Sequence, residues 1–84
     1  MKALDLYKFV KENELEYQWD NDDVILFVSY NYLLEWCNLL GYNFFVDDGL
    51  ACVMEYGYIG FKMKAICEHF GIELREIFEP IKNS

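Results

Sequence analysis

Residues 15–30, LEYQWDNDDVILFVSY, contain the pattern that decides the fold. In the first half of this stretch apolar residues alternate strictly with polar ones, which predicts a half-buried β-strand: Leu15, Tyr17 and Trp19. The second half, 24–30, is a continuous apolar run typical of an interior strand. A two-residue loop at Asn21-Asp22 places Trp19 opposite Val24, so that the apolar faces of both strands coincide. The stretch therefore predicts an antiparallel hairpin.

A second hairpin is predicted further along the chain, between residues 50–56 and 58–63. A turn at Tyr56-Gly57 gives a register in which Cys52 and Phe61 share an apolar face. Residues 42–46 form a further short strand in this interpretation, because Asp48-Gly49 is a favourable hairpin turn. The sequence therefore predicts an antiparallel sheet of four or five strands.

Apolar residues at helical spacing, together with helix-ending glycines and a proline, predict helices at residues 3–12, 31–40, 64–70 and 73–79. Asn31 is a suitable N-cap for the second helix, and Gly41 and Gly71 are suitable helix ends. The predicted fold class is α+β, a single domain of residues 1–84. Its elements follow in the order helix, hairpin, helix, hairpin and a helix pair, with the helices mainly on one face of the sheet.

The periodicity of these elements also predicts which side chains form the core. The expected buried residues are Trp36, Leu40, Leu26, Val28, Cys52, Phe61, Ile66 and Phe70.

Residues 63–78, MKAICEHFGIELREIF, resemble the last two helices of Cro/repressor-type helix-turn-helix domains. In that family this segment closes the core, and the recognition helix lies earlier in the chain. The earlier part of the present chain is acidic and rich in predicted strands, and nothing in it matches a recognition helix. The resemblance therefore implies a local helix–glycine–helix geometry and no DNA binding.

The charge distribution is one-sided. Residues 12–61 contain ten carboxylates and no Lys, Arg or His, so the net charge of −8 divides into −10 in this stretch and +2 in the remainder. Such a field repels nucleic acid and anionic membrane and attracts basic surfaces. We therefore expect no direct nucleic-acid binding, no membrane association and a basic protein surface as the partner.

Cysteine usage and the N-terminus predict a cytoplasmic location. The three cysteines, Cys37, Cys52 and Cys67, include no closely spaced pair, which fits free thiols in a reducing compartment. The N-terminal residues lack the apolar run of a signal peptide, and no stretch has the ~20 apolar residues of a membrane span.

No residue pattern in the chain predicts a reaction. His69 and Cys67 project about 200° apart on a helix, so they do not form a catalytic dyad, and the four ligands of a structural zinc site are not spaced recognisably. Two carboxylate pairs lie in predicted turns, where Asp is favoured for its backbone hydrogen bonds: Asp22-Asp23 and Asp47-Asp48. The sequence therefore predicts a protein that is not an enzyme and has no cofactor.

The candidate functional site is a surface. In the first hairpin, the carboxylates of the first strand and turn share one face with two apolar residues of the second strand, and a second acidic group lies further along the chain. The predicted partner-binding residues are Glu14, Glu16, Asp20, Asp22, Asp23, Ile25, Phe27, Asp47, Asp48 and Glu55. An apolar centre with a carboxylate rim is typical of a docking patch for a basic partner.

The resulting hypothesis is an inhibitor or adaptor whose acidic face occupies a basic groove, as small acidic proteins of phages and other mobile elements often do. Charge reversal at Glu14, Glu16, Asp20 and Asp23 is then expected to abolish binding and to leave the fold intact. Two alternatives are a homodimeric structural domain and a small-molecule-binding domain with an aromatic pocket. A simpler interpretation is that a helix covers Ile25 and Phe27 and that the acids keep the domain soluble.

Overall fold

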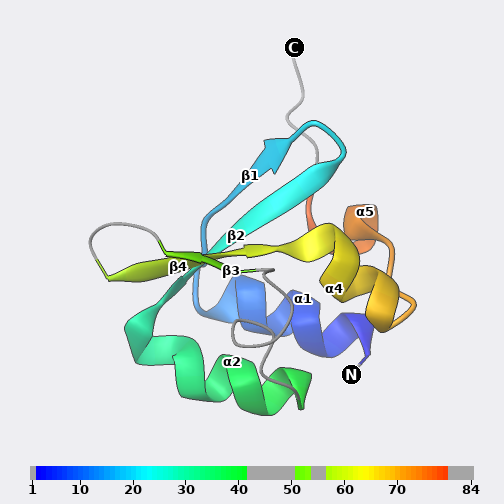
Figure 1. Ribbon diagram of the computed structural model, residues 1–84. Coiled ribbons are helices and arrows are strands. Elements are labelled where there is room, and N and C mark those ends of the chain that lie inside the picture. Colours follow the sequence, from blue (N-terminus) through cyan, green and yellow to red (C-terminus); the bar gives the residue numbers. More distant parts are fainter. Residues whose placement is uncertain (1, 42–50, 54–56, 80–84) are drawn as a thin grey trace.

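The computed structural model describes residues 2–41, 51–53 and 57–79, and it has the α+β class predicted from the sequence (Figure 1). Helices and strands follow one another in this order: α1 (Ala3–Glu12), β1 (Tyr17–Asp20), β2 (Asp23–Ser29), the 3₁₀ helix η1 (Tyr30–Tyr32), α2 (Leu33–Leu40), β3 (Ala51–Val53), β4 (Tyr58–Lys62), α4 (Met63–His69) and α5 (Leu74–Ile77).

The strands pair antiparallel in the order β1-β2-β4-β3. The register of the first hairpin is the predicted one, with Trp19 opposite Val24. Its tight turn places Asn21 at φ +57°, in the left-handed region that Asn tolerates better than most residues. The match between apolar faces therefore sets this register, as the alternation of residues 15–20 predicts.

The register between β3 and β4 differs from the predicted one by one residue. Ala51, and not Cys52, is the partner of Phe61, and Cys52 lies opposite Gly60. Short strands with few side chains have weakly specified registers, so the apolar pattern of 50–56 was not sufficient to choose between the two. The predicted strand at 42–46 and the predicted turn at Asp48-Gly49 lie outside the described residues.

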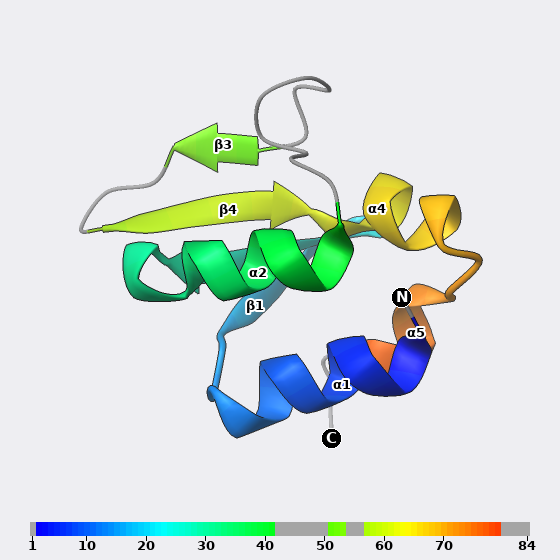
Figure 2. The same cartoon turned by 90° about the horizontal axis from the view of Figure 1, so that it is seen from below.

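The described helices lie on one side of the sheet, as Figures 1 and 2 show. Val24, Leu26 and Val28 of β2 are fully buried beneath them, whereas the intervening residues of β2 are only half-buried. Trp36 of α2 fills the space between helix and sheet, with its ring centroid 5.3 Å from that of Phe61 on β4. The aromatic residues of the core therefore join the helical layer to the sheet.

The segment after α5 also belongs to this layer. The ring centroid of Phe78 lies 4.8 Å from that of Tyr17 on β1. The indole nitrogen of Trp19 donates a hydrogen bond of 2.9 Å to the backbone carbonyl of Glu79. Side chains at alternate positions of β1 thus hold the C-terminal part of the described chain against the sheet.

Most of the predicted core is confirmed. Among the predicted core residues, those with at most 5 % of their surface exposed are Trp36, Leu40, Leu26, Val28, Phe61 and Ile66. Phe70 is only half-buried, because it follows the last residue of α4 at the edge of the helical layer. Phe78 is fully buried although it was not predicted to be, and the side chain of Cys52 lies outside the described part of the chain.

The predicted helix positions are close to the observed ones, but the start of α2 differs. Ser29, and not Asn31, caps the helical segment that leads into α2, because the Oγ of Ser29 accepts a hydrogen bond from the backbone N–H of Asn31. The chain then passes through η1 before α2 begins. At the other end Gly41 adopts φ +65°, the left-handed conformation predicted for a helix end.

Residues 63–78 have the local helix–glycine–helix geometry implied by their resemblance to helix-turn-helix domains. Gly71 has φ +69°, and the backbone N–H of Ile72 donates a 2.8 Å hydrogen bond to the carbonyl of Cys67 across the helix end. The helix that follows, α5, is a single turn. Within residues 2–41, 51–53 and 57–79 no helix is long and apolar enough to cross a membrane.

Candidate functional site

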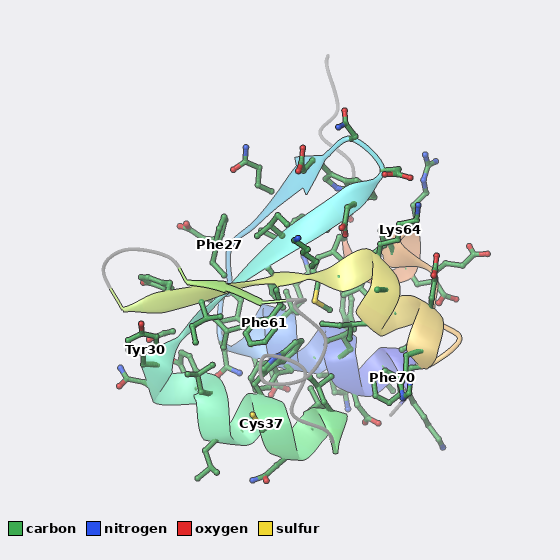
Figure 3. The ribbon with its side chains drawn as sticks, viewed as in Figure 1. Phe27, Tyr30, Cys37, Phe61, Lys64 and Phe70 are labelled. Carbon is green, nitrogen blue, oxygen red and sulfur yellow. The ribbon has the colours of Figure 1, made fainter. Side chains whose placement is uncertain are left out.

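The sheet has a second face, on the side away from the described helices, which we call the open face. The strand pairings place these residues on it: Glu16, Gln18, Asp20, Asp23, Ile25, Phe27, Ser29, Tyr58, Gly60 and Lys62. Phe27 on this face and Phe61 on the covered face lie on opposite sides of the sheet (Figure 3). The described helices lie on the opposite side of the sheet from this face (Figures 1 and 2).

The open face has apolar side chains in its middle and charged side chains at its margin. Ile25 and Phe27 are half-buried on the central strand β2, while Glu16, just before β1, and Asp20, at the end of β1, are exposed. Ile25 has Gln18 as its partner on one side and Lys62 on the other, and the N–H of Phe27 donates a 2.9 Å hydrogen bond to the carbonyl of Glu16. The structure therefore brings together the residues predicted for the centre and the rim of this surface.

At one end the open face continues into a hollow of about 340 Å³, which we call the end hollow. It is lined by Asn13, Glu14, Leu15, Glu16, Phe27, Ser29, Asn31, Tyr32 and Tyr58. Two carboxylates and three aromatic rings thus border one concave region, and none of these described lining residues is basic. Its volume is at the lower end of the range of about 300–1,000 Å³ that is typical of ligand pockets.

Glu14 reaches the end hollow from an unusual backbone position. The N–H of Leu15 bonds to the carbonyl of Val10 at 3.0 Å and the N–H of Glu14 to that of Lys11 at 3.2 Å, which together form a Schellman motif at the end of α1. Glu14 occupies the position of this motif that is usually glycine, and its φ is +51°. The chain therefore carries a charged side chain at a place where glycine relieves backbone strain.

Asp22 and Asp23, predicted as partner-binding residues, have contacts within the fold. One carboxylate oxygen of Asp23 accepts hydrogen bonds from the backbone N–H of Val24 at 2.7 Å and from that of Lys64 at 2.8 Å, in the first turn of α4. Asp23 thus acts as the side-chain cap of a helix that begins some forty residues further along the chain.

Asp22 pairs with the ammonium group of Lys64, next to the same helix end. The hydrogen bond and the charge of Lys64 lower the pKa of Asp22 below its ordinary value, and the pKa of Lys64 rises in turn. Both side chains are exposed to solvent, so this pair contributes little to stability. The carboxylates of the turn therefore connect the first hairpin to α4, and the other predicted acids of this hairpin, Glu14, Glu16 and Asp20, are exposed.

The remaining predicted site residues, Asp47, Asp48 and Glu55, lie outside the described residues. A second hollow, of about 310 Å³, lies beside α4 and α5 and is lined by Asp22, Lys64, Glu68, Ile72, Glu73, Leu74 and Arg75. Because acidic and basic groups both border it, it has no preference for one sign of charge.

The thiol of Cys67 and the imidazole of His69 both lie on α4. Burial, aided by the negative charges of Asp23 and Glu76, raises the pKa of the Cys67 thiol to about 12, so it remains protonated at neutral pH. The ring of His69 contacts Phe70, with centroids 4.8 Å apart. In the part of the chain that the structure describes, no three His, Cys, Asp or Glu residues are grouped so that they could hold a metal ion.

Tyr58 is one of the site residues that the sequence did not indicate. It lies beside Ser29 because β4 pairs with β2, a pairing between two hairpins that the apolar pattern of either hairpin does not specify. Comparison of the chain with models of protein families, with curated proteins and with solved structures found no match.

Proposed function

We propose that the protein is a binding module that docks on a basic surface of another protein through its open face. The observation that carries this proposal is the position of Ile25 and Phe27, half-buried side chains in the middle of a sheet face on the side away from the described helices. Exposed Asp20, on the neighbouring strand β1, and exposed Glu16, which directly precedes β1 and accepts the hydrogen bond from the N–H of Phe27, share this face. An apolar centre with a charged margin is the usual anatomy of a protein–protein interface.

The two kinds of side chain have different roles in this proposal. Complete burial of an Ile or Phe side chain contributes roughly 1.5–3 kcal/mol, and the half-buried Ile25 and Phe27 retain part of that for a complex. The carboxylates contribute long-range attraction to a basic surface, which raises the rate of association and makes it depend on salt. A partner with a basic groove fits both properties, and the module acts as an inhibitor where that groove otherwise holds nucleic acid.

The test is capture of partners from a cell lysate by three forms of the protein. The face variant carries Glu16→Lys and Asp20→Lys, which are both exposed; Glu16 directly precedes β1 and Asp20 is its last residue. The control variant carries Glu12→Lys and Glu68→Lys, exposed residues on α1 and α4. Each pair of reversals adds +4, so both variants have a net charge of −8 + 4 = −4.

Mass spectrometry should identify basic proteins that the wild type and the control retain at low salt and that the face variant loses. The captured protein, once purified, should bind with an affinity that falls as salt increases. Equal capture by all three forms, with each shown by circular dichroism to be folded, would contradict docking by the open face.

Self-association is the second candidate, and the exposure of Leu34 on the outer side of α2 favours it. This side chain has 74 % of its surface exposed, and Leu4 on α1 has 60 %. Contact between two copies through their open faces would bring Glu16 and Asp20 close to carboxylates of the other copy, so a dimer would use the helices instead. Light scattering of the wild type and of Leu34→Lys at high micromolar concentration distinguishes the two candidates, since docking by the open face needs no dimer.

A further inference from the structure

We infer that the end hollow receives an arginine side chain of the partner. This inference rests on the proposed docking function and names the residue type that the hollow recognises. The hollow adjoins Phe27, at the centre of the open face, so a partner seated on that face would present its side chains to it.

The charge of the hollow favours a cation. Glu14 and Glu16 both border it, and the described lining residues include no Lys, Arg or His that could neutralise them. The other polar lining groups are two amides and hydroxyl groups, whose oxygen atoms accept hydrogen bonds. An anion or an acidic peptide would meet only repulsion from the two carboxylates.

The aromatic lining favours arginine over lysine. Phe27, Tyr32 and Tyr58 border the same hollow, and 44 % of the surface of Tyr58 is exposed. A planar guanidinium group can stack on an aromatic ring while it donates paired hydrogen bonds to a carboxylate. The ammonium group of lysine is a point charge that holds its hydration shell more tightly and gains less from the rings.

The position of Glu14 is consistent with such a role. Its backbone is in the left-handed region at the end of α1, and Glu14 is one of the residues that line the hollow. A glycine there would suit the helix end better but would remove one of the two charges.

The experiment is a titration of the isotopically labelled full chain with three blocked tripeptides, followed by nuclear magnetic resonance of the backbone amides. The peptides are acetyl-Gly-Arg-Gly-amide, the same peptide with lysine, and the same peptide with citrulline, which keeps the shape of arginine without its charge. The arginine peptide should shift the amide signals of Glu14, Glu16, Phe27 and Tyr58. It should bind about two- to fivefold more tightly than the lysine peptide, and the citrulline peptide should not bind measurably.

Two variants test the two halves of the argument. Tyr58→Leu should reduce the preference for the arginine peptide over the lysine peptide, because Tyr58 is the one exposed ring of the three that border the hollow. Glu14→Gln should weaken both by a similar factor, whereas Glu12→Gln, outside the hollow, should change neither. The inference would be overturned if the wild type bound the arginine and lysine peptides equally, if it bound the citrulline peptide, or if it did not bind the arginine peptide. Shifts centred on Lys64 and Glu73 would also overturn it.

Glu16 lines the hollow and is also changed in the docking test, but the two tests can fail separately, because the peptides are titrated against the chain without that change. If the peptides do not bind but the face variant loses its partner, only the arginine assignment is overturned. If the arginine peptide binds but the face variant keeps its partner, only the docking function is overturned.

Discussion

Replacement of Asp23 by alanine should destabilise the protein, although Asp23 belongs to the acidic group of the first hairpin. Its carboxylate accepts hydrogen bonds from the backbone N–H groups of Val24 and Lys64, at 2.7 and 2.8 Å, and the second of these donors lies in the first turn of α4. Loss of a helix cap costs about 0.5–2 kcal/mol. Loss of the negative charge near the helix N-terminus costs about 0.3–1 kcal/mol more, so the expected total is about 1–3 kcal/mol.

Urea unfolding followed by tryptophan fluorescence measures this loss. In a domain of this size each kcal/mol also lowers Tm by about 4–8 °C. Asp23→Asn keeps an oxygen acceptor and loses only the charge, so its cost should stay below ~1 kcal/mol.

Asp20→Ala is the matched control, because Asp20 lies directly opposite Asp23 in the same hairpin. Removal of one of two facing like charges should leave stability unchanged or slightly increased. If Asp23→Ala proved as mild as Asp20→Ala, the assignment of Asp23 as the cap of α4 would be wrong.

The same contact changes an expectation from the sequence. Reversal of Glu14, Glu16, Asp20 and Asp23 to Lys was expected to leave the fold intact. With Asp23 as the cap of α4, the fourfold variant should be destabilised, and a loss of binding would then be ambiguous. Reversals confined to Glu16 and Asp20 avoid this difficulty.

Three further predictions test other parts of the structure. Glu14→Gly should stabilise the fold by about 0.5–1 kcal/mol in chemical denaturation, because the strain of a left-handed non-glycine residue, about 1–2 kcal/mol, is larger than the entropic cost of glycine, about 0.5–1 kcal/mol. Glu14→Ala keeps the backbone strain and should not show this gain. Phe61→Ala should cost ~3–5 kcal/mol in the same assay, because the ring is fully buried against Trp36, and a loss below ~1 kcal/mol would show that the side chain is not in the core. Cys67, with its pKa raised to about 12 by burial, should react with a thiol reagent at pH 8 only as fast as the protein unfolds. The half-buried Cys37 should react sooner, and equal rates for the two thiols, measured by peptide mapping, would refute the burial of Cys67.

The sequence by itself determined the local elements and the two-sided character of the first hairpin. The side chains of a strand alternate between faces, so the alternation at residues 15–20 was sufficient to place Glu16 and Gln18 opposite the apolar positions of β2. The helices were located in the same way, since a stripe such as Leu6 and Val10 repeats with the period of one turn. These features depend on residues close together in the chain, and their patterns are therefore visible in it.

Only the tertiary structure decided how the two hairpins pair with each other, and this pairing determines which residues meet at the candidate site. Pairing of β2 with β4 brings Tyr58 next to Ser29, and packing of α4 against the first hairpin turns Asp23 from a surface acid into a helix cap. These contacts join residues about thirty to forty positions apart, and their free energies depend on how whole elements pack, which no local pattern of residues encodes.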